Sequence, residues 1–217
     1  MVKYYSTRGH KEGITFDDII LSGVAPDNGL YLPDSTTIES LTYLTQEDLS
    51  YEDFVKTIFI SLDKASAKYL DNLSIYPGFQ NSPEPVLKDL DSETMVMELF
   101  HGPTKSFKDY ALQPLGAIAD KRLSEISEKG LVIVATSGDT GSAAINAVKD
   151  SENIDIVVLH PENKISEYQR KQMTSVIKEN VLNIAVKGSY DDCQKIAKEL
   201  LAKNPFKRKI ISLNSIN

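Results

Sequence analysis

The spacing of apolar residues along this chain of 217 residues changes at about residue 83. Beyond that point, short runs of consecutive apolar residues alternate with stretches in which apolar residues recur every three or four positions. The runs lie at 131–135, 154–159, 181–186 and 209–213, and the helical stretches lie at 142–149, 166–178 and 189–203. Continuous apolar runs predict strands buried on both faces, and intervening helices predict parallel connections. The pattern therefore predicts an α/β domain with a doubly wound parallel sheet.

The first 82 residues follow a different pattern, which predicts a mainly helical region. Short strands are expected at 4–7 and 30–32, and helices at 14–21 and within 50–70. Prolines and a glycine gather between residues 74 and 85, which is typical of a linker. We therefore expect two units, an N-terminal region at 1–82 and the α/β domain at 83–217.

Composition and charge exclude several classes of protein. Hydrophobic residues make up 41% of the chain and charged residues 25%, so a substantial core is available to one large domain or two small ones. The net charge is −7, and the longest basic run is Lys207-Arg208-Lys209, which argues against a nucleic-acid surface. No apolar run approaches the roughly 18 residues of a membrane span. Because Cys193 is the single cysteine and the N-terminus lacks a signal-peptide pattern, we expect a cytoplasmic protein.

One candidate for chemistry is Lys108, which follows a Gly102-Pro103 turn and precedes a helical pattern. Ser106 or Thr104 is expected to cap that helix, which puts Lys108 in its first turn. The positive end of the helix dipole disfavours an ammonium there, and a neutral amine is the form that attacks a carbonyl. The ordinary alternative is a surface lysine on a helix.

A second candidate is the segment Thr136–Gly141, between the strand at 131–135 and the helix at 142–149. Ligands of open α/β sheets bind at the carboxyl ends of the strands, and backbone N–H groups at a helix start attract anions. Gly138 and Gly141 allow close backbone approach. A phosphate loop, a carboxylate loop and a simple tight turn all remain open, although neither the P-loop nor the dinucleotide glycine motif is present.

Other polar residues have ordinary structural explanations. The three histidines are scattered, and neither a cysteine nor an acidic cluster completes a metal site. We expect His101 to orient its own turn and Asp109 to face the dipole at the start of its helix. Arg170 and Lys171 are expected on a solvated helix face, and Cys193 is expected to be a structural thiol on a helix.

The segment Glu98–Thr104, together with Phe107-Lys108-Asp109 and Gln113, resembles the cofactor-lysine motif of the long-chain threonine synthases. These are pyridoxal-phosphate (PLP) enzymes that share their fold with tryptophan synthase β and with the serine and threonine dehydratases. The resemblance runs along nearly the whole chain. Further matching segments lie at 6–9, 28–33, 135–143, 169–174 and 214–217.

This resemblance implies a lyase of threonine biosynthesis that converts O-phospho-L-homoserine and water into L-threonine and phosphate. Lys108 would bind PLP and transfer protons, and Asp139 would lie near the cofactor's ring hydroxyl, where more distant relatives have asparagine. The substrate's carboxylate would be held by Thr136, Ser137, Gly138, Thr140 and Gly141.

The resemblance also implies that part of the site lies elsewhere. Long-chain threonine synthases are about twice as long, and their glycine-rich cup for the cofactor phosphate is expected beyond residue 217. The chain is therefore expected to be an N-terminal half that is inactive alone. Two alternatives remain: another PLP lyase of the same fold acting on a phospho-amino acid, and a non-catalytic α/β module that binds an anion. The oligomeric state and any effector are left open.

Overall fold

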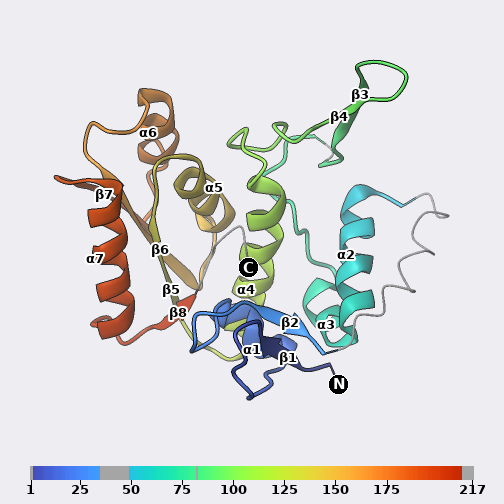
Figure 1. The fold of residues 1–217 in the computed structure, drawn as a ribbon, viewed down its shortest axis with the longest axis horizontal. Coiled ribbons are helices and arrows are strands. Elements are labelled where there is room, and N and C mark those ends of the chain that lie inside the picture. Colours follow the sequence, from blue (N-terminus) through green and yellow to red (C-terminus); the bar gives the residue numbers. More distant parts are fainter. Residues whose placement is uncertain (1, 35–48, 82, 212–217) are drawn as a thin grey trace.

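The computed structural model describes residues 2–34, 49–81 and 83–211. Its largest sheet contains four parallel strands in the order β7-β6-β5-β8 (Figure 1). Their bounds are β5 Gly130–Ala135, β6 Ile154–Pro161, β7 Val181–Val186 and β8 Lys209–Ile211. The predicted α/β fold with a parallel sheet is confirmed, and the part of the fourth predicted strand beyond Ile211 lies outside the described residues.

Helices cover both faces of this sheet (Figure 1). One face carries α5 (Asp139–Val148), with α4 (Asp109–Glu125) and α6 (Glu167–Thr174) beside it, and the other carries α7 (Tyr190–Lys203). Strand β5 explains the division, because successive side chains of a strand point to opposite faces. Leu131 and Ile133 pack with the buried Cys193 of α7, whereas Val132 and Val134 belong to the larger core on the other face.

Helix α7 begins and ends where the sequence predicts. Ser189 is its N-cap, and the reciprocal contacts of Ser189 and Asp192 form the predicted capping box. Asn204 ends the helix in the left-handed conformation, with φ of 37°. The bounds of this helix thus follow from local signals.

The predicted end of the second strand and the predicted end of the helix that follows it are wrong. His160-Pro161 does not end the second strand, because both residues pair with β7, Pro161 opposite Val186. Helix α6 ends at Thr174, four residues before the predicted end at Lys178. One of its last carbonyls finds a partner outside the helix, since Asn183 Nδ2 of β7 donates a hydrogen bond to Met173 O.

The N-terminal region consists of a small antiparallel pair and short helices (Figure 1). The elements are β1 Tyr4–Ser6, α1 Phe16–Ser22, β2 Tyr31–Pro33, α2 Tyr51–Leu62, a 3₁₀ turn η2 at Lys64–Ser66, and α3 Ala67–Leu70. Helix α1 has Thr15 as its N-cap, as predicted, and packs against α4 and β8. One cluster of buried side chains runs from this region into the α/β core. The domain boundary at residue 82 stays a prediction.

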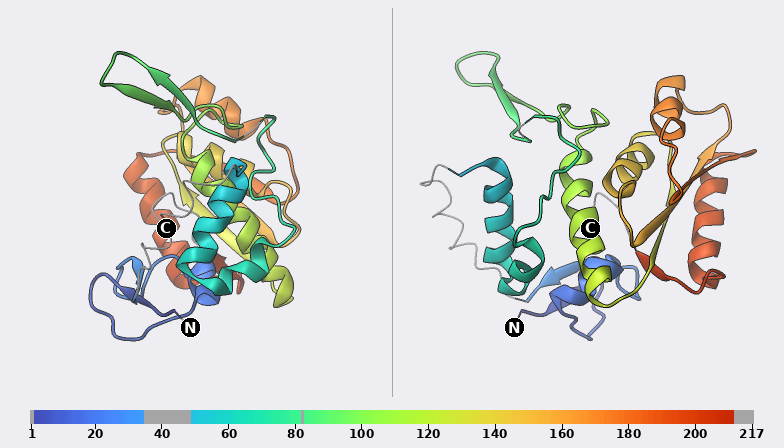
Figure 2. Two further views of the ribbon diagram at one scale, coloured as in Figure 1. Left: turned by 90° about the vertical axis from the view of Figure 1, so that its right-hand side faces the viewer. Right: turned by 180° about the vertical axis from the view of Figure 1, so that it is seen from behind.

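A separate two-stranded hairpin, β3 (Val86–Asp89) and β4 (Met95–Glu98), precedes α4. It projects away from the rest of the molecule in both views of Figure 2. Strand β4 covers the apolar run before the lysine segment, but residues 86–89 lack a run of apolar residues, so the sequence pattern predicts no strand there. The described part of the chain contains no helix with the length and apolarity needed to cross a membrane.

We predict that Ile156→Ala lowers the free energy of unfolding by about 2–5 kcal/mol, because it removes buried methyl groups from a central strand. Ile156 is 1% exposed. The matched control is Ile177→Ala, since Ile177 is 91% exposed and its truncation should change stability by less than about 0.5 kcal/mol. Urea denaturation measures both variants, and equal losses would contradict the described core.

Candidate active site

The N-termini of α4 and α5 lie side by side at the edge of the sheet where β5 and β6 end (Figure 1). Close packing of the two helices produces this arrangement. A Cβ atom on Gly116 of α4 would stand 2.8 Å from the carbonyl oxygen of Ala147 on α5. A larger residue at position 116 would therefore push the helices apart and separate their N-termini.

Lys108 is the N-cap of α4, with helical φ and ψ of −64° and −21°. The predicted caps are wrong, because neither Ser106 nor Thr104 occupies that position. Ser106 Oγ instead accepts a hydrogen bond from the Lys108 N–H at 3.3 Å. Lys105 N–H bonds back to Gly102 O at 3.1 Å, and this turn brings Thr104 over the start of the helix.

Asp109 organises the segment that carries the lysine. Its carboxylate is fully buried and accepts hydrogen bonds from Thr104 N at 2.8 Å and Thr104 Oγ1 at 2.7 Å. Burial raises the pKa of Asp109, and the bonds from Thr104 oppose that rise. A Cβ on Gly102 would meet the same carboxylate at 2.5 Å, so only glycine fits there. Asp109 thus does more than face the helix dipole, because its hydrogen bonds with Thr104 hold the preceding turn against the start of α4.

The Lys108 side chain reaches the start of α5. Its Nζ lies 4.0 Å from Asp139 Oδ2 and 4.5 Å from the centroid of the Phe107 ring, and the side chain is 17% exposed. An ion pair at this distance, with Asp139 half exposed, contributes little to stability. The contact matters for geometry, since the primary amine of Lys108 lies beside the N-terminus of α5.

Helix α5 begins at Asp139, three residues before the predicted start at Ser142, so Asp139–Gly141 form its first turn. The cause is Thr136, whose buried Oγ1 accepts hydrogen bonds from Gly138 N at 2.9 Å and Gly141 N at 3.0 Å. Gly138 has φ of 152°, a conformation that strains residues with a Cβ. Gly138 is thus the N-cap of α5, and Thr136, one residue after β5, supplies the side-chain oxygen that binds the first turn.

The first turn of α5 leaves backbone donors available. The first N–H groups of a helix have no partner within it, and those of Asp139 and Thr140 make no hydrogen bond to another described residue. Together with the helix dipole, these donors suit an anion. Ser137 is exposed and Thr140 half-buried, whereas Thr136, Gly138 and Gly141 are buried and shape the loop. Their roles in binding stay predictions.

Sequence reasoning missed two glutamines of α6. Gln169 Nε2 donates to Asp139 Oδ1 at 2.6 Å, and Gln172 Nε2 donates to Thr104 O at 2.7 Å. Helix α6 thus contacts the first turn of α5 through Gln169 and the lysine segment through Gln172. The available signal was their spacing of three, which puts both amides on one face of a helix.

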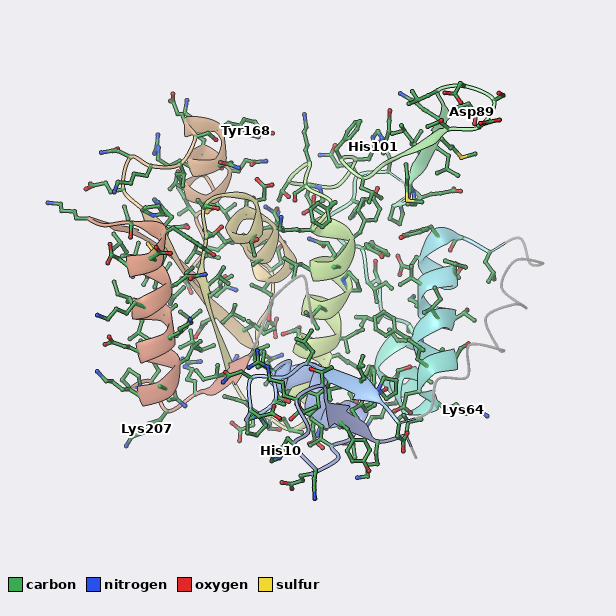
Figure 3. The ribbon with its side chains drawn as sticks, viewed as in Figure 1. His10, Lys64, Asp89, His101, Tyr168 and Lys207 are labelled. Atoms are coloured by element: carbon green, nitrogen blue, oxygen red, sulfur yellow. The ribbon has the colours of Figure 1, made fainter. Side chains whose placement is uncertain are left out.

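The structure also describes the other polar residues named in the sequence analysis. His101 binds Glu98 at 2.9 Å and lies toward the hairpin, far from His10 (Figure 3). Arg170 and Lys171 are exposed, and Cys193 is buried, which raises the pKa of its thiol. Among the described residues no group of histidines, cysteines and carboxylates could hold a metal ion.

A cavity of about 400 Å³ lies between α1, α2 and α4. Its described lining consists of apolar side chains, tyrosines and backbone, and none of those residues is charged. Such a lining does not suit a phosphorylated ligand. The region around Lys108 and the start of α5 is therefore the stronger candidate for anion chemistry.

Comparison with known proteins shows which family the chain resembles. Residues 3–72 match the family model described as threonine synthase N terminus. The whole chain is 39% identical to the threonine synthase of Pseudomonas aeruginosa and 38% identical to threonine synthase-like 2 of Xenopus laevis, and in each case it covers 48% of the relative. The chain thus spans about half the length of the curated relatives it matches.

Solved structures give the same result. The chain superposes on a PLP-bound threonine synthase from Brucella melitensis with a TM-score of 0.85 and 35% identity, covering 100% of this chain and 48% of that one. For threonine synthase from yeast the TM-score is 0.84 and the identity 30%, with 99% and 46% covered. The family resemblance and the fold predicted from sequence are confirmed.

We predict that Asp109→Ala lowers the free energy of unfolding by about 2–3 kcal/mol, because it leaves buried donors of Thr104 without partners. Asp109→Asn should retain most of the stability, since an amide can accept from Thr104 N and donate to Thr104 Oγ1. Glu167→Ala, which removes an exposed ion pair with Lys171, is the control. Urea denaturation measures all three, and equal stability of the alanine variant and the control would contradict the structural role of Asp109.

Proposed function

We propose that this chain forms the lysine-bearing half of a PLP-dependent threonine synthase, which converts O-phospho-L-homoserine and water into L-threonine and phosphate. The observation that carries the proposal is the position of Lys108 Nζ, 4.0 Å from Asp139 at the N-terminus of α5. Similarity to threonine synthases over the whole chain supports it. The activity belongs to a protein with both halves of the site.

The residues present fit both PLP and an anionic substrate bound beside it. Lys108 offers a primary amine to the cofactor's aldehyde, from a segment held rigid by the buried Asp109. The unpartnered N–H groups of Asp139 and Thr140 offer donors to an anionic group nearby. Bound PLP would supply an electron sink for chemistry at the substrate's α carbon.

The chain's own residues would position the substrate and transfer protons. Lys108 Nζ takes the proton from the substrate's α carbon and later returns a proton. The substrate carboxylate lies against the first turn of α5, where the N–H groups of Asp139 and Thr140 and the side chains of Ser137 and Thr140 are accessible. Gln169 Nε2 donates a hydrogen bond to the carboxylate of Asp139, which would lie near the ring hydroxyl of bound PLP.

A second candidate comes from the 38% identity to threonine synthase-like 2, which nearly equals the identity to the bacterial threonine synthase. A lyase of this kind would also use Lys108 and the segment Thr136–Gly141. It would act on a phospho-amino acid but form another product. The product released from O-phosphohomoserine distinguishes the two, because only threonine synthase yields threonine.

The test uses the 217-residue chain and a chimera. The chimera joins residues 1–217 to the part of the Pseudomonas aeruginosa threonine synthase that lies beyond its matched region. We expect the chimera to release phosphate and form threonine from O-phospho-L-homoserine, and the chain alone to do neither. Release of phosphate without threonine would favour the second candidate, and a folded chimera without turnover would contradict both.

Lys108 should carry the cofactor in this chimera. Reduction with borohydride in the presence of PLP, followed by peptide mapping, should put the pyridoxyl group on Lys108. Lys108→Ala should lose both the label and the turnover, because its amine does the chemistry. Lys171→Ala, which changes an exposed lysine of α6, should lose neither. A label on another lysine of the unsubstituted chimera would contradict the assignment.

Gly138→Val should lower the turnover of the chimera by at least about 10-fold, because loops that hold the substrate need accurate geometry. A side chain at 138 would overlap the Gln169 amide and strain the backbone. Binding of PLP, followed by its absorbance, should persist, because Lys108 is held independently by Asp109. A variant with normal turnover would mean that this segment is only a turn.

A further inference from the structure

Strand β7 is an open edge of the parallel sheet. Among the described residues it pairs with β6 alone, and it lies on the side of the molecule away from α2 (Figure 1). The opposite edge strand, β8, includes the charged Lys209 and packs against α1. Natural sheets protect their edges with charges, prolines or covering elements, and the six residues of β7 contain neither a charge nor a proline. An edge of this kind suits pairing with another strand.

Alternate residues of β7 point their backbone groups away from β6. Asn180 O, just before the strand, accepts a hydrogen bond from Ile156 N of β6, so even-numbered positions bond to β6. The odd-numbered positions therefore direct their N–H and C=O groups outward, at Val181, Asn183 and Ala185. The N–H of Val181 bonds to Lys178 O at 3.1 Å, and the other outward groups make no hydrogen bond to a described residue. These groups are available to a further strand.

The side chains of β7 add an apolar surface to this edge. Asn183 points toward α6, since its Nδ2 donates a hydrogen bond to Met173 O at 3.2 Å. Leu182 and Ile184 therefore point to the other face of the sheet. Helix α7 packs over β5 and β6 on that face, and Leu182 and Ile184 are 53% and 38% exposed. The edge thus combines free backbone groups with exposed apolar side chains.

One antiparallel register lets this edge pair with a second copy of itself. If Asn183 lies on a two-fold axis, its N–H donates to Asn183 O of the second copy, and Ala185 N–H donates to Val181 O of the second copy. All of these groups point outward, as a hydrogen-bonded antiparallel pair requires. The same register sets Leu182 opposite Ile184 of the second copy, and apolar pairs of this kind stabilise a sheet.

Charged residues flank the strand in a complementary arrangement. Glu179 precedes β7 and Lys187 follows it, and both are exposed without an ion-pair partner among the described residues. In the register centred on Asn183, each Glu179 faces Lys187 of the other copy, which favours this pairing. Residues 178–187 carry two lysines and one glutamate, so the net charge of −7 is not concentrated at this edge.

We propose that two copies of this chain pair through antiparallel β7 strands, with Asn183 on the two-fold axis. Because each copy contributes the same edge, the contact closes at a dimer. Six residues per strand make a small interface, so the association is weak and depends on protein concentration. The proposal is independent of the proposed function, because neither Lys108 nor the first turn of α5 contributes to the contact.

Sedimentation velocity of the 217-residue chain at increasing concentration tests the dimer. We expect the monomer to convert to a dimer, and the assembly to stop there. A chain that stays monomeric up to about 1 mM would overturn the proposal. Assembly that continues beyond the dimer would also overturn it, because an isologous contact leaves no free edge on β7.

Charge reversal shows whether the dimer uses this register. Glu179→Lys should weaken the dimer at least about 10-fold, because it sets lysines of the two copies against each other. Adding Lys187→Glu to that variant should restore the dimer, because the two charges then exchange places. The matched control is Glu128→Lys, which reverses an exposed charge between α4 and β5 and should leave the dimer unchanged. Equal association of all four proteins would overturn the proposal.

Hydrogen exchange provides a second measurement that needs no variant. At concentrations where the dimer predominates, the amides of Asn183 and Ala185 should exchange at least about 5-fold more slowly than in the monomer, because strand pairing protects them. The amide of Ile184, which points to β6, should change far less. Exchange at Asn183 and Ala185 that does not depend on concentration would overturn the proposal. Neither measurement needs PLP or turnover, so this proposal and the proposed function fail separately.

Discussion

The close packing of α4 against α5 is the constraint on which the candidate site depends. Each helix starts at the same edge of the molecule, and Gly116 lets α4 approach the backbone of α5 at Ala147. Lys108 begins one helix and Asp139 the other, so the distance between the helices sets the distance between amine and carboxylate. The parallel sheet contributes by fixing where α5 starts, since β5 ends at Ala135.

Three further sets of hydrogen bonds fix the geometry of the site. Buried Asp109 holds the lysine segment, and buried Thr136 holds the first turn of α5. Gln169 and Gln172 of α6 connect the two. The bonds of Asp109 and Thr136 are buried, where the loss of a partner costs more than the bond itself contributes, whereas the bond between Gln169 and Asp139 is exposed. The site is thus held by polar contacts on an apolar framework.

The features that the sequence could predict depend on local signals. Helix α7 follows from its Ser189 capping box and its apolar spacing, and β5 follows from a continuous apolar run. The boundaries that it predicted wrongly involve side-chain contacts that apolar spacing does not encode. Helix α5 starts early because the hydroxyl of Thr136, one residue after β5, accepts hydrogen bonds from Gly138 N and Gly141 N. Near the early end of α6, Asn183 of β7 donates a hydrogen bond to Met173 O from ten positions along the chain.

The site residues likewise divide into those that a local motif identifies and those that depend on contacts between distant parts of the chain. Lys108 was found because a contiguous motif carries it. Gln169 was missed because its role appears only when α6 reaches Asp139, 30 positions earlier in the chain. The hairpin was missed for a related reason, since β3 has no apolar run and its pairing with β4 provides the order.

Zero-length cross-linking of the 217-residue chain tests most directly whether Lys108 and the start of α5 form one site. A carbodiimide joins a lysine amine to a carboxylate only where the two are in contact. Lys178 and Asp150, 2.7 Å apart, provide the positive control. We predict a cross-link between Lys108 and Asp139, found by mass spectrometry of the digested chain. Efficient coupling of the control pair without any link between Lys108 and Asp139 would contradict the account.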